Sequence, residues 1–430
     1  MTARRMALRL LTAVEAGGWS DRLLQIHEPK LDDPRDRRLV HNLVMTTLRW
    51  QGALDLRLSA AVHGPFAELD PLVRAALRIG LCQLTPLGLP APIAVSSTVD
   101  ALREEGGAKA SSLVNAVLRR LERDGPAPLD PRATIPAWLR ERWDRELGVE
   151  RTFALVQRIN QPPPACFVLR HGAITRSQLL IEWGALGIQA QPSRRDPDVV
   201  LVTRGAAQTS PAFGRGDLIA MDEGAALVAN LARPGDERPV ADLAAAPGGK
   251  ALRLAHGTSA PLVALEVVSS RCITLARALR ERGPENRTQV MRADACRPPL
   301  MRGAFGTVLL DAPCSGTGTL RRRPERRWRV TEAQIAAAAA KQARMLDAAA
   351  ELVAPGGRLI YAVCSLEPEE GRIQIAEFLR RDSRFEARDP TTLVVGDVSG
   401  LVCSDPLRLS TRPDAEDHEG FVAAAMIRRR

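Results

Sequence analysis

The sequence predicts a multidomain protein: an all-α region at the N-terminus, a small α+β subdomain, and an α/β domain built on a parallel sheet. Its 430 residues exceed the ~100–200 residues of an ordinary domain, so two or three domains are expected. The spacing of apolar residues also changes along the chain, from helical periodicity to short apolar runs that alternate with helical segments.

The N-terminal region reads as helical up to about residue 125. Apolar residues such as Leu39, Leu43 and Leu48 recur at helical spacing, and no strand pattern interrupts them. A segment rich in proline and glycine then runs from Asp124 to Pro131, and it cannot continue a helix. We therefore expect a helical domain over residues 1–128.

The middle region, residues 132–234, has a mixed pattern. It predicts a helix over 137–160, a stop at the prolines 162–164, and short strands at 166–169 and 199–202. This pattern favours a small α+β linking subdomain.

From residue 235 the apolar runs are short and alternate with helical segments, which is typical of a parallel sheet covered on both faces. The catalytic candidate is therefore the α/β domain, residues 235–430. Its predicted strands are 239–243, 262–265, 288–291, 308–310 and 359–363.

The composition favours a soluble cytoplasmic protein without a metal. No apolar run approaches the ~20 residues of a membrane span, and the first residues lack the apolar core of a secretory signal. The seven cysteines are odd in number and form no CxxC pair, which argues against disulfides and against a zinc site. The net charge of +10 favours a nucleic-acid partner, but the excess is nearly all arginine, as a GC-rich coding bias would also produce.

A turn of small residues follows the predicted strand 239–243 and precedes a helix. Such a turn lets a ligand approach the backbone, although an ordinary tight turn would look similar. A phosphate-binding P-loop is rejected, because its first glycine is missing and Ala251 replaces the hydroxyl that would bind magnesium. The turn consists of Ala244, Ala245, Ala246, Pro247, Gly248, Gly249 and Lys250.

Acidic residues recur where predicted strands end. Glu266 lies about 20 residues past the glycines, where nucleoside-binding folds place an acid on the ribose. Asp294 and Asp311 follow two later strands. One such acid is commonly a helix cap or an ion-pair partner, but three of them beside a glycine turn favour a nucleoside site.

Cys314 and Cys364 also follow predicted strands, in positions suited to reactive thiolates, although a lone buried cysteine is usually inert. A segment with six arginines and one tryptophan, 321–329, comes shortly after Cys314. Its arginines would contact phosphates, or would form only a solvated face. The RNA-binding candidates are Arg321, Arg322, Arg323 and Arg326.

Three motifs together resemble the RNA cytosine-C5 methyltransferases of the NOL1/NOP2/Sun type: residues 242–250, 311–318 and 361–370. Residues 115–120 are similar to the NusB-like domain of the bacterial ribosomal small-subunit (RsmB, Fmu/Sun) members, and residues 407–409 and 418–421 to the closing motif of the family. The resemblance implies a NusB-like helical RNA-binding domain followed by a Rossmann-like methyltransferase domain that uses S-adenosylmethionine.

The resemblance also implies the site. Cys364 would attack carbon 6 of a cytosine, Asp311 would hold the cytosine edge, and Cys314 would assist proton removal at carbon 5. Residues 244–250, Glu266, Asp294 and Asp311 would bind S-adenosylmethionine. The expected partner is RNA, foremost 16S ribosomal RNA, and the expected state is a monomer.

Four positions depart from the family pattern: Ala244, Ala251, Met221 and Gly371. Three other hypotheses stay open at this point. In the first, the substrate is another RNA such as tRNA. In the second, the protein is a DNA cytosine methyltransferase with Cys314 as nucleophile. In the third, it is a non-catalytic NusB-like RNA-binding factor.

Overall fold

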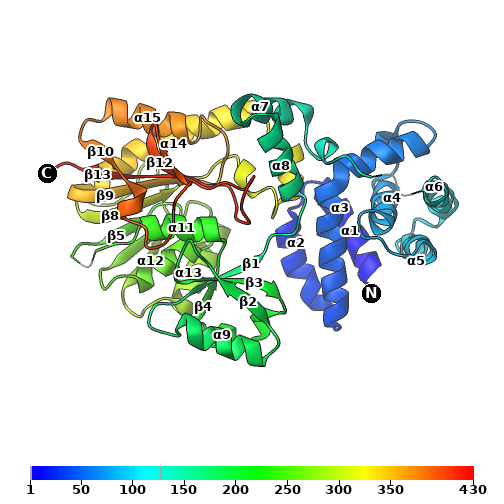
Figure 1. Cartoon of the computed structure of the whole chain (residues 1–430), viewed down its shortest axis with the longest axis horizontal. Coiled ribbons are helices and arrows are strands. Elements are labelled where there is room, and N and C mark those ends of the chain that lie inside the picture. The colour runs from blue at the N-terminus through cyan, green and yellow to red at the C-terminus, as the bar shows by residue number, and fades with distance from the viewer. Residues whose placement is uncertain (1, 126–127, 236) are drawn as a thin grey trace. The chain divides into compact units, whose positions relative to one another are not determined.

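A computed structural model describes residues 2–125, 128–235 and 237–430, and the chain forms two compact units (Figure 1). The first unit consists of Met1–Pro162 together with Leu320–Arg329. The second consists of Pro163–Thr319 and Val330–Arg430. Within the described ranges, none of the helices has both the length and the apolar character needed to cross a membrane.

The N-terminal part of the first unit is helical, as the sequence predicts. Side chains of Thr2, Asp33 and Asp70 accept hydrogen bonds from backbone N–H groups at the start of their helices, which fixes where those helices begin. Buried leucines such as Leu8 and Leu43 form one core between the helices. The helices are α1 (Ala3–Glu15), α2 (Ser20–His27), α3 (Pro34–Ala61), α4 (Pro71–Leu84), α5 (Ala91–Glu104) and α6 (Ser111–Arg123).

The helix predicted over 137–160 is two helices, α7 (Ala137–Leu147) and α8 (Val149–Ile159). Gly148 separates them because its φ of 85° lies in the left-handed region, which a helix cannot include. Both helices belong to the first unit, so the structure places the boundary at Pro162/Pro163 rather than at residues 128–132. Pro126 and Ala127 of the predicted linker lie outside the described residues.

The segment Leu320–Arg329, which includes the short helix η7 (Pro324–Trp328), completes the first unit. The Arg327 guanidinium is fully buried and donates to the carbonyls of Arg49 and Thr134 (3.1 Å each) and to Oδ1 of Asn160 (2.8 Å). Burial, with a smaller contribution from the charge of Arg49, lowers the pKa of Arg327 to about 9. Glu325 accepts hydrogen bonds from the backbone N–H and the hydroxyl of Ser20. This segment is thus part of the core of the first unit.

The second unit begins with a small antiparallel sheet in the order β2-β3-β1-β4. Phe167 and Trp183 pack edge to face beneath it, with ring centroids 5.7 Å apart. The predicted strands at 166–169 and 199–202 are therefore confirmed as β1 and β3. The elements are β1 (Ala165–Leu169), α9 (Arg176–Ala185), β2 (Gln189–Pro192), β3 (Val199–Arg204), α10 (Pro211–Gly214) and β4 (Leu218–Ala220).

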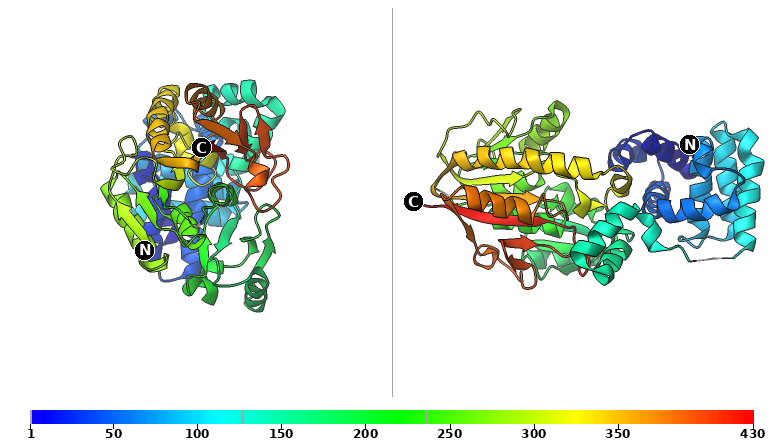
Figure 2. Two further views of the ribbon diagram at one scale, coloured as in Figure 1. Left: turned by 90° about the vertical axis from the view of Figure 1, so that its left-hand side faces the viewer. Right: turned by 90° about the horizontal axis from the view of Figure 1, so that it is seen from above.

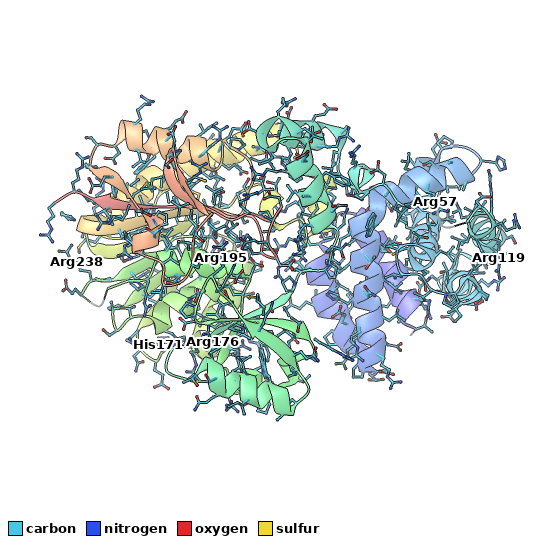
Figure 3. The ribbon with its side chains drawn as sticks, viewed as in Figure 1. Arg57, Arg119, His171, Arg176, Arg195 and Arg238 are labelled. Carbon is cyan, nitrogen blue, oxygen red and sulfur yellow. The ribbon has the colours of Figure 1, made fainter. Side chains whose placement is uncertain are left out.

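Buried polar groups join this small sheet to the C-terminal part of the same unit. Arg195, labelled in Figure 3, donates to the carbonyls of Asp397 and Ser399 at 2.8 Å each. Asn230 donates to Oδ2 of Asp196 and to the carbonyl of Val395. These bonds explain why residues 163–234 form one unit with the α/β domain instead of a separate subdomain.

The larger sheet has the order β11-β12-β13-β9-β8-β5-β6-β7, and strands β9, β8, β5, β6 and β7 run parallel. Every strand predicted in the α/β domain is present. The strands are β5 (Val240–Asp242), β6 (Leu262–Leu265), β7 (Thr288–Met291), β8 (Phe305–Asp311), β9 (Val353–Val363), β10 (Phe385–Arg388), β11 (Val402–Ser404), β12 (Leu407–Ser410) and β13 (Val422–Arg428).

Helices cover both faces of this sheet, as the apolar runs predict. Val240 and Ile360 pack on one face with α11 (Glu223–Leu231), α12 (Gly249–His256) and α13 (Ser269–Arg282). Ala241 and Tyr361 pack on the other face with α14 (Glu332–Leu352) and α15 (Arg372–Arg381), which lie side by side in Figure 2. The chain runs from β5 outward to β7 and then returns to β8 on the opposite side of β5. Ligands of open α/β sheets bind at such a reversal, beyond the carboxyl ends of the strands.

Candidate active site

The turn between β5 and α12 lies at this reversal and needs its glycines. Gly248 has a φ of 115°, which favours glycine, and α12 begins at the next residue. A Cβ atom on Gly249 would lie 3.0 Å from Cε of Met221. The predicted small-residue turn, residues 244–250, therefore lies at the carboxyl end of β5, where the strand order reverses.

Two of the predicted acids follow the outer parallel strands. Glu266 directly follows β6 and is buried; Oε1 accepts a hydrogen bond from the N–H of Val268 (2.9 Å), and Oε2 lies 3.3 Å from Nε of Arg271. Asp294 lies after β7, is exposed, and accepts a hydrogen bond from the N–H of Cys296. Both acids lie on the same rim as the glycine turn.

Asp242, at the end of β5, was not among the predicted site residues. It is 1% exposed, and neither of its carboxylate oxygens makes a hydrogen bond of good geometry within the described residues. Burial and the negative charge of Asp311 raise the pKa of Asp242 to about 7, against the opposing charge of Lys250. The sequence carried the relevant signal, since Asp242 ends its strand as Asp311 does.

Replacing Asp242 with asparagine should remove a pH dependence of stability. The folded-state pKa of about 7 exceeds the ordinary 3.8, so between these values the folded protein holds a proton that the unfolded chain releases. The free energy of unfolding therefore falls as pH rises through this window and is constant above it. The difference in the free energy of unfolding, Asp242→Asn minus wild type, should rise by on the order of 3 kcal/mol between pH 4 and pH 8.

Denaturant unfolding of both proteins at several pH values measures this difference, and any constant cost of the substitution cancels. Parallel curves for the two proteins would contradict the raised pKa of Asp242.

Lys250 and Asp311 form an ion pair across the reversal. Nζ of Lys250 lies 2.7 Å from Oδ2 of Asp311 and 5.0 Å from the ring centroid of Phe421. Burial alone would lower the pKa of Lys250, but the charge and hydrogen bond of Asp311, with the charges of Cys364 and Asp242, raise it above its ordinary value. Lys250 thus stays positively charged and holds the Asp311 carboxylate at the edge of the site.

Cys314 and Cys364 follow the neighbouring strands β8 and β9, and their sulfur atoms are 3.3 Å apart. The loops that carry them are tied together, since the N–H of Gly318 donates to the carbonyl of Cys364 (3.1 Å). The hydrogen bond with Cys364 is the largest cause that raises the pKa of Cys314 well above its ordinary value; burial and the charges of Cys364, Glu370 and Asp311 follow. Cys314 therefore holds its proton more tightly than an ordinary cysteine does.

The arginine run does not form one exposed face. Arg321 is buried, and its guanidinium donates to the carbonyls of Gln161 (3.0 Å) and Pro162 (2.6 Å) in the first unit. Arg322 and Arg326 are half-buried, and Arg323 is exposed and paired with Asp21. Periodicity could not distinguish these positions, because the segment is mostly short 3₁₀ turns and irregular backbone.

The residues that the structure describes include no group of three or more histidine, cysteine, aspartate or glutamate side chains arranged to hold a metal ion.

Two family models match the chain, a methyltransferase model over the parallel sheet and its rim and a NusB model over the helical N-terminal region. The family model described as 16S rRNA methyltransferase RsmB/F matches residues 229–427, and the NusB family model matches residues 1–123. The chain belongs to the RsmB/F methyltransferase family.

Relatives match almost the whole chain. The ribosomal RNA small subunit methyltransferase B of Xanthomonas campestris is 34% identical over 394 residues, covering 90% of each chain. That of Vibrio cholerae is 31% identical, covering 83% of this chain and 85% of its own.

Two solved structures share the fold. PH0851 superposes with a TM-score of 0.82 at 24% identity, covering 99% of this chain and 98% of its own. NSun6 from Pyrococcus horikoshii, solved with SFG, gives a TM-score of 0.60 at 18% identity and covers 69% of this chain and 99% of its own.

Proposed function

We propose that this protein transfers a methyl group from S-adenosylmethionine to carbon 5 of a cytosine in 16S ribosomal RNA, through a covalent adduct with Cys364. The observation that carries the proposal is the contact between the two cysteine sulfur atoms beside the Lys250–Asp311 pair. The names of the relatives, which are ribosomal RNA small subunit methyltransferases, support the substrate.

The residues at the rim fit S-adenosylmethionine, which supplies an electrophilic methyl group when bound. The glycine turn would hold the amino-acid end of the cofactor, and the Glu266 carboxylate would accept hydrogen bonds from ribose hydroxyls. Asp242 is a buried carboxylate without a good hydrogen bond, which suits a cationic ligand. Asp294 and Asp311 would complete the cofactor site from the neighbouring loops.

The chemistry begins with the nucleophile. Cytosine carbon 5 is a weak nucleophile, so a thiolate must first add to carbon 6. Cys364 is suited to this attack, because the raised pKa of Cys314 favours a protonated thiol there, which can donate a hydrogen bond to a Cys364 thiolate 3.3 Å away. Asp311, fixed by Lys250, would hydrogen-bond to the cytosine edge and stabilise the adduct.

Once carbon 5 carries the methyl group, the adduct must lose the proton from that carbon before the bond between carbon 6 and Cys364 can break. Once the Cys364 sulfur is bonded to carbon it carries no negative charge, and the largest cause of the raised pKa of Cys314 disappears. Cys314 can then release its own proton to water, and its thiolate accepts the carbon 5 proton as the double bond re-forms and Cys364 leaves as a thiolate. The two thiols would thus act in sequence.

The target cytosine must be unpaired or flipped out of its helix, because a stacked base is unreachable. Of the predicted RNA contacts, Arg323 is exposed and suited to phosphate, with Arg322 and Arg326 beside it. Arg321 serves the fold of the first unit through its carbonyl contacts. The NusB-type domain would provide further RNA contacts.

The proposal is tested by mapping 5-methylcytosine in the RNA of cells with and without this protein. One cytosine of 16S ribosomal RNA should lose its methyl group in the deletion strain and regain it when the wild-type gene is returned. Loss of the mark in tRNA instead would reassign the substrate. An unchanged map would favour a non-catalytic RNA-binding factor.

Replacing Glu266 with alanine should weaken the binding of S-adenosylmethionine by roughly 10- to 100-fold, since a charge-assisted hydrogen bond contributes ~1.5–3 kcal/mol. Isothermal titration calorimetry measures the affinity. Glu281 is an exposed carboxylate on α13 that pairs with Arg277, so Glu281→Ala is the matched control and should bind S-adenosylmethionine with wild-type affinity. Equal affinities for both variants would remove Glu266 from the ribose site.

A further inference from the structure

A buried carboxylate outside the proposed chemistry connects the two cysteine loops. Glu370 lies just before α15 and is fully buried. Its Oε1 accepts hydrogen bonds from the backbone N–H of Ser315 (2.8 Å) and from Nε2 of Gln342 (3.0 Å). Its Oε2 accepts hydrogen bonds from the hydroxyls of Ser315 and Ser365, the latter at 2.5 Å. One side chain therefore accepts four hydrogen bonds.

The partners of Glu370 are the residues that follow the two cysteines. Ser315 comes directly after Cys314, and Ser365 comes directly after Cys364. Gln342, from α14, donates the same amide nitrogen to the carbonyl of Pro313 at 3.0 Å, so the backbone is held on both sides of Cys314. The two serine hydroxyls also lie within 3.0 Å of each other. This network fixes both loops against a single acceptor.

Only a carboxylate can fill this place. Its two oxygens accept all four hydrogen bonds, whereas a glutamine would present one acceptor oxygen and an amide group that itself donates. At least two of the four donors would then lose their acceptor in a fully buried place, which would favour movement of the loops. An aspartate would keep both acceptor oxygens, but its side chain is one methylene group shorter, so the oxygens would lie further from the four donors.

We propose that Glu370 is a positioning residue that holds the thiols of Cys314 and Cys364 in contact by binding the residue after each of them. The role for catalysis rests on the function proposed above, in which the two thiols act in sequence on one cytosine. The geometric part, the separation of the two sulfur atoms, does not depend on that function.

The separation can be tested with dibromobimane, which becomes fluorescent when it has alkylated two thiols. Wild-type protein should be cross-linked between Cys314 and Cys364, and Cys314→Ser gives the background from the other cysteines. Glu370→Gln should be cross-linked about 10-fold more slowly, because the loops lose their common acceptor. Asn230→Ala removes a buried hydrogen-bonding group of the same unit that contacts neither cysteine loop, and it should be cross-linked at the wild-type rate.

Steady-state methylation of RNA gives the second readout. Glu370→Gln should lower kcat by roughly 10- to 100-fold and leave KM for RNA and for S-adenosylmethionine within about 2-fold of wild type, because misplaced reacting groups affect the chemical step. Glu370→Asp should recover part of the lost kcat. If Glu370→Gln does not fold, Ser365→Ala removes one of the four hydrogen bonds and should slow cross-linking and kcat together, to a smaller extent.

The proposal would be overturned if Glu370→Gln had the same cross-linking rate and the same kcat as the wild-type protein. It would also be overturned if Asn230→Ala, at the same decrease in Tm, lost as much cross-linking and kcat, because Glu370 would then act only through stability. If wild-type protein is cross-linked but methylates no RNA, the proposed function fails, and the cross-linking rates still decide the role of Glu370.

Discussion

Replacing Cys364 with alanine should abolish methyl transfer and leave no covalent protein–RNA complex. The attacking sulfur is removed, so carbon 5 is never activated, and a loss of roughly 10⁴-fold or more in kcat is expected. S-Adenosylmethionine and RNA should bind with unchanged affinity, since neither depends on that sulfur atom. Methylation assays and titrations of the two ligands measure the separate effects.

The companion variant, Cys314→Ala, should give the opposite result on the same denaturing gel. Cys364 can still attack and the methyl group can still be transferred, but the proton at carbon 5 is not removed. The protein should therefore accumulate as a covalent complex with RNA that survives denaturation. Cys403→Ala, on strand β11, is the matched control and should behave as wild type.

Two other patterns on this gel would refute the assignment. Trapping by Cys364→Ala with none by Cys314→Ala is the pattern of a DNA-type cytosine methyltransferase, in which Cys314 is the nucleophile. No complex with any variant, and no methylation by wild type, is the pattern of a non-catalytic binding factor.

Replacing Arg327 with alanine should destabilise the first unit by about 3–5 kcal/mol. The substitution leaves buried carbonyls of Arg49 and Thr134 and the Asn160 side chain without their donor, and it opens a cavity at a fully buried position. Chemical denaturation followed by far-ultraviolet circular dichroism, to which helices α1 to α8 of this unit contribute, measures the loss. Arg323→Ala, on the same segment but exposed, should change the stability by less than about 1 kcal/mol.

Equal stability of Arg327→Ala and Arg323→Ala would mean that the segment 320–329 contributes nothing to the core of the first unit. A large loss for both would mean that the Arg323–Asp21 pair, and not burial, holds the segment.

The sequence predicted the sheet and its rim because these depend on local pattern. Short apolar runs alternate with helical segments, and the carboxyl ends of parallel strands must meet at one edge. Asp311 ends a strand, and Glu266, Cys314 and Cys364 each come after one, so their gathering at the rim could be anticipated from strand positions alone.

Features that depend on partners distant in sequence could not be predicted in this way. The burial of Asp242 without a good hydrogen bond depends on which strands flank β5. The role of Glu370 depends on Ser315, which precedes it by 55 residues. The break at Gly148 could not be predicted, because a glycine can also lie within a continuous helix, where it only lowers the stability of the helix. The arginine run was ambiguous because charge along the chain does not tell which guanidinium groups meet carbonyls.

The position of residues 320–329 in the chain bears on how the protein is made. The first unit is complete only when this segment has been synthesised, yet its other residues, up to Pro162, emerge from the ribosome much earlier. Translation of the roughly 160 intervening residues takes about 8 to 30 s at ~5–20 residues per second. Throughout that time Ser20 and Asn160 lack Glu325 and Arg327 as partners. The helical unit therefore reaches its final fold only after strands β1 to β8 have been synthesised. Cutting the gene between Pro162 and Pro163 would separate one core into two polypeptides.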